Sequence, residues 1–440
     1  MLQTLANAFK VPDLRKKMLF TALIILLFRL GAAIPVPFTA AAGGIIQDVN
    51  GSNMMNYLSM MTGDAFNYGT LFAMSITPYI NSSIIIQLLT VAIPALENLA
   101  KEGEEGKKKI SFLTRIGAVI IAVLQSTAYF FYLRSGGFIA TAADGSPYTG
   151  FSAALQALVI IFVLSAGACL LMWMGESINQ KGIGNGISMI LFAGIVSRIP
   201  TTLTYIFAYF KQGGIYYLFA PIALIIMIGL VVFIVWIDNS ERRLPVAYAK
   251  RVVGRKMYGG QSTHMPIKVN MSGVMPIIFA SSILSLPPTF KMFFGNRIVA
   301  GSGWDRFFNL FNTTNWFYAI IYFVLIIFFA YFYAAIQYNP IEMANNLRRN
   351  SGSIPGIRPG KPTSDYIAKV LSRITLLGAI LISVVAILPI LFSQITMLCG
   401  RPMNISLGGT SVIILVGVAL ETVRQLESQM MMRHYKGFLD

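Results

Sequence analysis

The sequence has 440 residues, of which 56% are hydrophobic and 12% are charged, and its mean hydropathy is +0.68. A soluble domain carries roughly 25% charged residues, so this composition excludes an ordinary water-soluble protein. The formal net charge of +17 would suggest nucleic-acid binding in a soluble chain, but in a membrane protein basic residues also mark topology.

Apolar segments of about 20 residues, the length that a helix needs to cross a bilayer, recur along the chain. They lack the alternation of barrel strands, so we predict helices, whose backbone groups are satisfied internally. We predict about ten spans, near residues 18–38, 70–95, 110–133, 152–175, 184–208, 215–237, 268–289, 316–338, 370–394 and 408–430. Segment 54–68 is apolar but too short to cross.

The basic residues indicate the orientation of these spans. If the N-terminus is cytoplasmic, about 26 of the 34 Lys and Arg residues fall on that side and about seven on the other. This asymmetry is the one that the positive-inside rule requires. We therefore expect both termini in the cytoplasm, with an N-terminal arm at 1–17 and a tail at 431–440.

Two cytoplasmic segments, 238–268 and 340–373, carry more basic residues than topology needs. The first holds seven Lys and Arg residues and the second holds six, and both contain glycines that permit tight turns. Such segments bind anionic lipid headgroups or RNA phosphates, or they act as orientation signals alone. The residues by themselves leave these alternatives open.

A short repeat links the second and seventh predicted spans. Pro78, Ile80 and Ser83 have the same spacing as Pro276, Ile278 and Ser281. With five spans per half, the halves have opposite orientations, and matching proline-interrupted helices in inverted repeats indicate a functional site near the midplane. Coincidence in an apolar chain is the alternative explanation.

The spans offer little chemistry. None carries Asp, Glu or His near its centre, as an ion-coupled transporter usually does, and Arg29 is the one clear charge within a span. Residues 182–186 only superficially resemble a phosphate loop, because they follow no strand and lack the Lys-Ser/Thr ending. The two cysteines and two histidines are too dispersed for a metal site. We expect a channel with an apolar lining, no cofactor, no metal and no enzymatic activity.

Several long stretches resemble the SecY family of protein-conducting channels. They are residues 75–89, 171–188, 248–255, 261–270, 339–342 and 354–360, in the order of the family, and the likeness extends over nearly the whole chain. The resemblance implies an all-α polytopic membrane protein in which two inverted five-helix halves, 18–210 and 211–430, form a clamshell around an hourglass pore.

The resemblance also assigns residues to parts of such a channel. The pore ring is expected at Ile76, Ile80, Ile187, Leu191, Ile278 and Ile414. The plug, near 54–68, is expected to include Tyr57, Leu58, Met61, Gly63, Phe66 and Asn67. The lateral gate is expected at Gln87, Ser281 and Ser282, and docking of the ribosome or the SecA motor at Arg251, Arg255, Lys256 and Arg358.

The implied partners are the small membrane subunits SecE and SecG, the SecA ATPase, the ribosome, signal sequences with their nascent polypeptides, and membrane lipids. The implied location is the bacterial plasma membrane, although thylakoid relatives share the motifs. Two other functions are considered: a secondary transporter for small solutes, and an insertase or scaffold without a through-pore.

Overall fold

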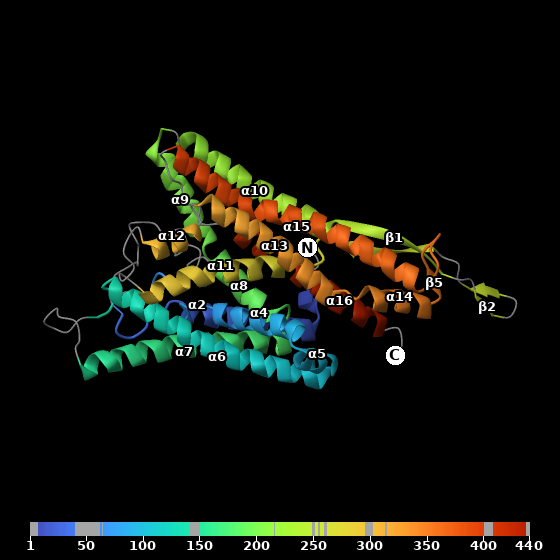
Figure 1. The fold of residues 1–440 in the computed structure, drawn as a ribbon, viewed down its shortest axis with the longest axis horizontal. Helices are drawn as coiled ribbons and strands as arrows, with labels where there is room; N and C mark the ends of the chain where they lie inside the picture. The colour runs from blue at the N-terminus through green and yellow to red at the C-terminus, as the bar shows by residue number, and fades with distance from the viewer. Residues whose placement is uncertain are drawn as a thin grey trace.

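The computed structural model describes residues 8–39, 62–63, 65–140, 150–214, 216–248, 251–253, 256–258, 262–294, 302–312, 315–399 and 408–436. Long helices dominate these residues (Figure 1). Each predicted span coincides with one or two of them: α2 (Pro12–Gly31), α4 (Thr77–Ala92), α6 (Glu104–Ser135), α7 (Phe151–Lys181), α8 (Gly186–Val196) with α9 (Ile199–Gln212), α10 (Tyr216–Asn239), α11 (Met275–Phe294), α13 (Trp316–Gln337), α15 (Lys361–Leu398) and α16 (Gly409–Lys436).

Within the described residues, seven helical segments are long and apolar enough to cross a membrane by themselves. If α4 and α5 (Pro94–Lys101), which are bent by 101° relative to each other, together form one span, the number of such segments rises to eight. The two remaining predicted spans are α2 and α11, each of 20 residues. Helix α2 includes three consecutive basic residues, Arg15 to Lys17, and α11 contains three serines and an internal proline pair. The polytopic all-α fold is confirmed.

The proline-containing helices differ from the expectation in one respect. Pro78 and Pro276 lie in the first turn of α4 and α11, so these helices begin at the prolines and are not interrupted by them. The first-turn position is favourable because the N–H that proline lacks has no partner within the helix there. Irregular backbone precedes each helix: turns at 71–76 and bends and turns at 269–274.

The helices form two groups that meet along a seam. Helices α2, α4, α6, α7 and α8 contact one another in the first group, which α9 continues along the chain, and α10, α11, α13, α15 and α16 do so in the second. Contacts of α8 with α16, of α9 with α10, and of α11 with α4 and α6 join the groups. Figure 1 shows α6 and α7 along one side of the molecule and α10 and α15 along the other.

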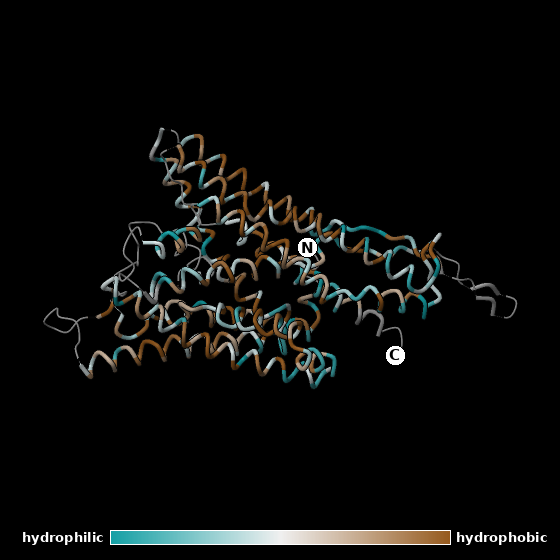
Figure 2. Tube along the Cα trace, in the orientation of Figure 1, coloured by the Kyte–Doolittle hydropathy of each residue, from teal (hydrophilic) through white to brown (hydrophobic). Residues whose placement is uncertain are grey.

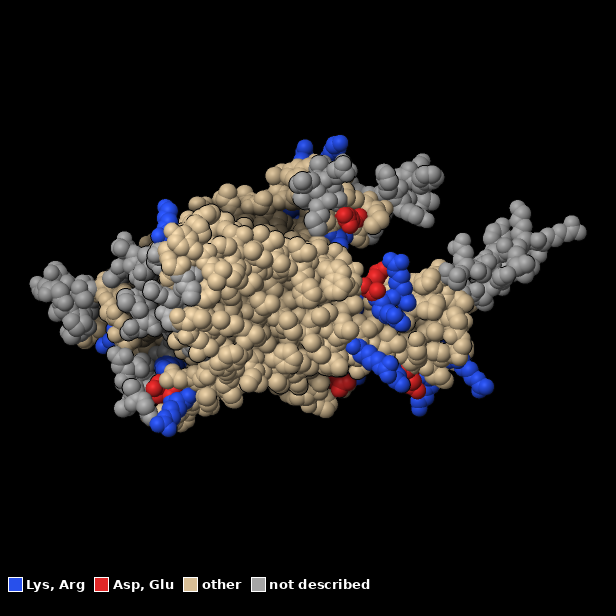
Figure 3. All heavy atoms as spheres, turned by 90° about the horizontal axis from the view of Figure 1, so that it is seen from above, with Lys and Arg blue, Asp and Glu red and all other residues tan. Residues whose placement is uncertain are grey.

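The surface matches a protein that lies across a bilayer. Apolar residues dominate the middle of the long helices, and hydrophilic residues gather toward the ends (Figure 2). In the space-filling view a broad band without charges separates two charged ends (Figure 3). Helix α15, with 38 residues, is about 57 Å long, which exceeds the ~30 Å hydrocarbon core, so it extends beyond the membrane.

The two basic segments form one small unit at one end of the bundle. Strands β1 (Glu241–Tyr248) and β4 (Ser262–Lys268) pair antiparallel, with Glu241 opposite Lys268, and β5 (Gly352–Ser353) adds to β1. Strands β2 (Arg251–Val253) and β3 (Lys256–Tyr258) extend the hairpin, and α14 (Pro340–Arg349) lies at the same end (Figure 1). Leu244, Ile267 and Ile354 share a buried cluster beneath it.

The glycine-rich turn at 182–186 is a tight connection between α7 and α8. The Asn185 side chain caps α8 by accepting the backbone N–H of Ile187 at 3.1 Å, and Gly186 donates to Asn179 Oδ1 at 2.7 Å. A Cβ atom on Gly186 would lie 1.9 Å from the carbonyl oxygen of Gly175. The turn therefore has a packing role, and its glycines permit close approach of two helices.

We expect Gly186→Ala to destabilise the protein by about 1–3 kcal/mol, the usual cost of overpacking. Thermal unfolding in detergent measures the change. Gly229→Ala in α10 is the matched control, since no atom lies within 4 Å of the added Cβ. Equal melting temperatures for the two variants would contradict this packing role.

Candidate functional site

The six aliphatic residues predicted for the pore ring all belong to the large hydrophobic core that both helix groups share. They come from four helices or the residue just before one: Ile76 and Ile80 from α4, Ile187 and Leu191 from α8, Ile278 from α11, and Ile414 from α16. All are buried except Ile187, which is partly buried against the same cluster. The core to which they belong therefore draws residues from both helix groups.

The repeat in the sequence is also a repeat of backbone geometry. The carbonyl of Ile76 accepts the N–H groups of Tyr79 and Ile80 at 3.0 and 3.1 Å. The carbonyl of Val274 accepts those of Ile277 and Ile278 at 3.2 and 3.3 Å. The same first turn therefore follows the same irregular approach in both groups and places Ile80 and Ile278 equivalently.

This equivalence identifies a residue that the sequence prediction missed. Val274 occupies the position that corresponds to Ile76, is partly buried, and packs against the central cluster. A Cβ atom on Gly417 of α16 would lie 2.4 Å from Val274 Cγ2, so the absence of a side chain at Gly417 makes room for Val274. The signal was available, since Val274 and Ile76 stand at the same offset from Pro276 and Pro78.

Part of the predicted plug lies within the described residues. Tyr57, Leu58 and Met61 lie outside them. Residues 65–69 form turns, in which Phe66 is buried and Asn67 is partly buried. The Tyr129 hydroxyl of α6 donates to the Phe66 carbonyl at 2.6 Å, and the two rings lie 4.7 Å apart. This segment is therefore held against the first helix group.

Arg29 joins three parts of the first group. Its Nη1 donates to Ser197 Oγ at 3.0 Å and, at 3.5 Å, to the carbonyl of Gly63 in the predicted plug. Ser197 is the C-cap of α8, and Arg29 lies in the last turn of α2. A cation near helix C-termini is favourable because the helix dipoles are negative there. Arg29 therefore has hydrogen-bond partners within the protein.

The polar residues predicted for the lateral gate lie on helices that contact each other. Helix α11 contacts both α4 and α6. Ser281 and Ser282 of α11 are buried, and Gln87 of α4 is partly buried. Their side-chain bonds are local: Gln87 donates to Ser83 Oγ at 3.2 Å, and Ser281 donates to the Ile278 carbonyl at 2.9 Å. The structure brings the helices together without a hydrogen bond that links these three side chains.

Three of the four predicted docking residues, Arg251, Lys256 and Arg358, have a described backbone at the end of the molecule that carries the strands. Arg251 and Lys256 belong to β2 and β3, although their side chains are outside the described part, and Arg255 is outside it entirely. Arg358 is exposed, and its carbonyl accepts the Thr363 hydroxyl at 2.8 Å next to the start of α15. It is therefore available to a partner.

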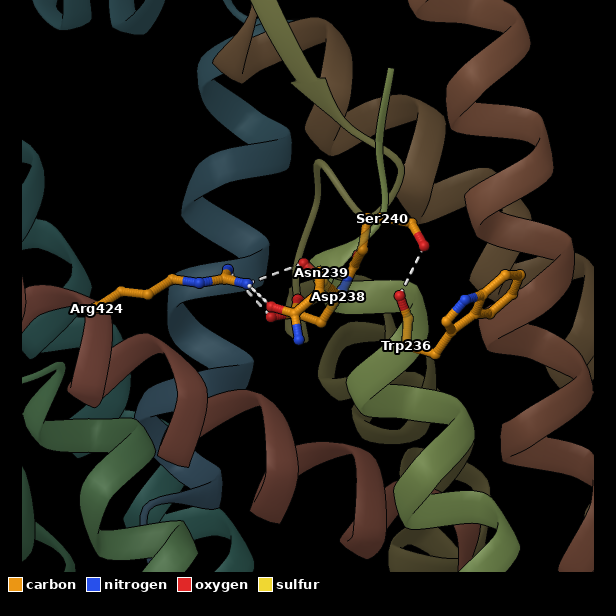
Figure 4. A network of polar contacts seen from close by, with 6 residues as sticks. Trp236, Asp238, Asn239, Ser240 and Arg424 are labelled. Carbon is orange, nitrogen blue, oxygen red and sulfur yellow. Dashed lines mark hydrogen bonds and ion pairs between the residues drawn. The ribbon is translucent and has the colours of Figure 1, made fainter. Parts of the chain in front are cut away.

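A polar cavity of about 420 Å³ opens beside the central cluster, toward the end with the strands. Its lining combines the start of α8 with strand β4, the approach to α11, and α16, and includes Asn185, Asn270, Val274, Glu421 and Arg424. Arg424 and Asp238 form an ion pair in its wall, at 3.1 Å (Figure 4). The sequence prediction missed this pair, because its members are 186 positions apart.

Comparisons with known proteins identify the family of this chain. The sequence profile of the SecY family matches residues 70–423. Protein translocase subunit SecY of Mycobacterium tuberculosis is 43% identical over 454 aligned residues, which cover all of both chains. The chain belongs to the SecY family. The corresponding subunit of Streptomyces coelicolor is 42% identical over 455 residues, again with full coverage of both.

Solved structures show the same fold. One described as a protein conducting channel has a TM-score of 0.65 at 17% identity and covers 94% of this chain and 92% of its own. Sec61 in a canine ribosome–channel complex has a TM-score of 0.64 at 16% identity with the same coverages. This SecY-family chain is thus a multi-pass membrane protein with the role of a protein-conducting channel, as the sequence predicted.

We expect Tyr129→Phe to loosen the segment around Phe66 in this SecY-family chain. Loss of the hydroxyl removes the shorter of two hydrogen bonds to the Phe66 carbonyl, which keeps the Gly69 N–H at 3.3 Å, at a cost of about 0.5–1.5 kcal/mol. The rate at which maleimide labels Tyr68→Cys, in a variant with serine at Cys169 and Cys399, measures the loosening. Tyr205→Phe, at an exposed position of α9, is the control, and an equal labelling rate in both variants would contradict the role of Tyr129.

Proposed function

We propose that the chain forms the pore of a protein translocase in the bacterial plasma membrane, with both termini in the cytoplasm. It passes unfolded secretory polypeptides across the membrane and releases transmembrane segments sideways into lipid. The observation that carries the proposal is that the six aliphatic residues, which come from four helix regions, all belong to one apolar core shared by the two helix groups. Full-length similarity to translocase subunits supports it.

In this proposal the aliphatic residues form a flexible gasket. Ile80 and Ile278 line the waist from equivalent helix starts, Ile76, Ile187, Leu191 and Ile414 complete the ring, and Val274 extends it. An apolar constriction resists ions and water by dewetting. Aliphatic side chains that move aside admit an extended polypeptide and close around it. Residues 18–210 and 211–430 act as the two halves, and the contact between α8 and α16 supports a pore between them.

The gates follow from the same arrangement. The segment near 54–68 acts as a plug, and the bonds of Arg29 and Tyr129 to its described part support a closed resting position. Helices α4 and α6 face α11 and α13 at the lateral gate, where Gln87, Ser281 and Ser282 would meet a signal sequence. The contacts of α11 with α4 and α6 support this assignment.

The proposed soluble partners carry groups that can pair with the basic residues of the strand-bearing end. The strand-bearing end, with Arg251, Arg255, Lys256 and Arg358, would dock the ribosome and the SecA motor, since arginine pairs bidentately with phosphate or carboxylate. A ribosome-bound Sec61 among the structural relatives supports the ribosome as a partner. SecE and SecG would cover lipid-facing helices. The motor would supply the energy, so the chain itself is proposed to have no enzymatic activity.

Translocation in purified vesicles tests the function. We expect vesicles that contain this chain with SecE to take up a protease-protected preprotein when SecA and ATP are added. Vesicles that lack the chain are the negative control. Failure of a folded sample while a known translocase works would reject the channel proposal. Uptake of a small solute by the chain alone would favour a secondary transporter instead.

We expect the double variant Ile80→Gly, Ile278→Gly to conduct ions at rest, because two matched members of the apolar waist are removed. Planar-bilayer recordings measure the resting conductance. The control is Ile85→Gly, Ile320→Gly, which truncates two exposed residues on α4 and α13. A resting conductance equal to that of the control would exclude these residues from the gasket.

A further inference from the structure

One polar cluster ties the base of the β1–β4 hairpin to helix α16. Arg424 of α16 places Nη1 3.1 Å from Asp238 Oδ2, and its Nη2 donates to the Asp238 carbonyl at 3.0 Å and to Asn239 Oδ1 at 2.9 Å. Figure 4 shows the guanidinium directed at the last turn of α10. The Asp238 side chain is 13% exposed and that of Arg424 is 33% exposed, so the carboxylate is largely shielded from water and the guanidinium is partly exposed.

Asp238 also bonds to the segment that leaves the hairpin after β4. Asn270 Nδ2 donates to Asp238 Oδ1 at 3.3 Å, and the Val269 N–H donates to the Ser240 carbonyl at 2.9 Å. Residues 238–240 lead into β1, and residues 269–270 follow β4. The segments before β1 and after β4 therefore meet beside Asp238, and Arg424 connects this junction to α16.

From the junction two paths lead to the central cluster, one along a helix and one along the irregular segment that precedes α11. Along α16, Ile414 lies ten residues before Arg424, about 15 Å on a straight helix. Along the chain, Asn270 is followed by Ser272, whose hydroxyl donates to the Ala330 carbonyl of α13 at 3.1 Å, and then by Val274 and Ile278. Val274 packs on Gly417 of α16, so the two paths meet again.

We propose that Asp238 and Arg424 form a clamp that transmits movement of the β1–β4 hairpin to the waist. The inference rests on the proposed function and adds positioning residues to it. When a partner docks on the hairpin, its paired strands move together. With the clamp intact, this movement shifts α16 and the start of α11, and with them Ile414 and Ile278. With the clamp broken, the hairpin moves at its base while the waist stays closed.

The test compares docking with transport in the same vesicles. The variants are Asp238→Asn, Arg424→Gln and Arg424→Lys, and Arg243→Gln is the matched control. Arg243 makes a 2.7 Å ion pair with Glu241 on the same hairpin, but its side chain is 69% exposed, and such surface pairs contribute little. Binding of the motor ATPase to the vesicles gives a Kd, and protected preprotein gives a transport rate.

Coupling between sites typically corresponds to ~5–150-fold effects, and we expect Asp238→Asn and Arg424→Gln to slow transport by about tenfold. The Kd with which the motor ATPase binds vesicles of these two variants should equal the wild-type value. The transport rate of Arg424→Lys should lie between those of wild type and Arg424→Gln, because lysine keeps the positive charge but lacks the forked geometry of arginine. Arg243→Gln should transport at the wild-type rate. Unchanged transport in the clamp variants, or an equal loss of docking and transport, would overturn the clamp.

A covalent bridge separates coupling from folding. Asp238→Cys with Arg424→Cys, in a variant with serine at Cys169 and Cys399, should transport slowly and recover when a short bis-maleimide joins the two thiols. A bridge that forms without recovery would refute the inference. If wild type itself transports nothing, the proposed function fails and the clamp fails with it, whereas normal wild-type transport confines any failure to the clamp.

Discussion

Lipid offers no hydrogen bond to a peptide group, and this constraint underlies the whole molecule. Every segment that crosses the hydrocarbon core must satisfy its backbone internally, so the chain folds into long helices. Irregular backbone is tolerated only where protein surrounds it or where it lines a water-filled cavity. The turns at 71–76 are almost entirely buried, and the bends and turns at 269–274 lie largely along the polar cavity.

The same constraint explains why the candidate waist is built at helix starts. A proline in the first turn costs no hydrogen bond and presets the helical φ angle, so α4 and α11 begin abruptly at the depth of the cluster. The two N–H groups that follow share one carbonyl in each case. The same backbone geometry positions Ile80 and Ile278, as expected if each of two inverted halves contains one copy of this helix start. An aliphatic seal needs no exact side-chain match, which suits a passage for polypeptides of many sequences.

Charged side chains gather toward the ends of the bundle (Figure 3), and two of the arginines connect elements that are far apart in sequence. Arg29 joins α2, α8 and the segment at Gly63, and Arg424 joins α16 to the base of the hairpin. A shielded ion pair depends on its geometry, because an unpaired charge there is costly. These contacts are therefore suited to fixing positions, while the apolar centre between them is free to open.

Much of this protein follows from its sequence alone. Hydropathy and the scarcity of charge determined the helices and their approximate limits, because burial in lipid is a local requirement on each segment. The proline repeat determined that Ile80 and Ile278 are equivalent, and family motifs determined the class of channel. Tertiary structure decided the rest. That α4 and α11 begin at their prolines, that Val274 fits against Gly417, and that Arg424 pairs with Asp238 all depend on contacts between distant segments. No local pattern encodes such contacts, since their energies arise only when packing removes water and brings the partners together.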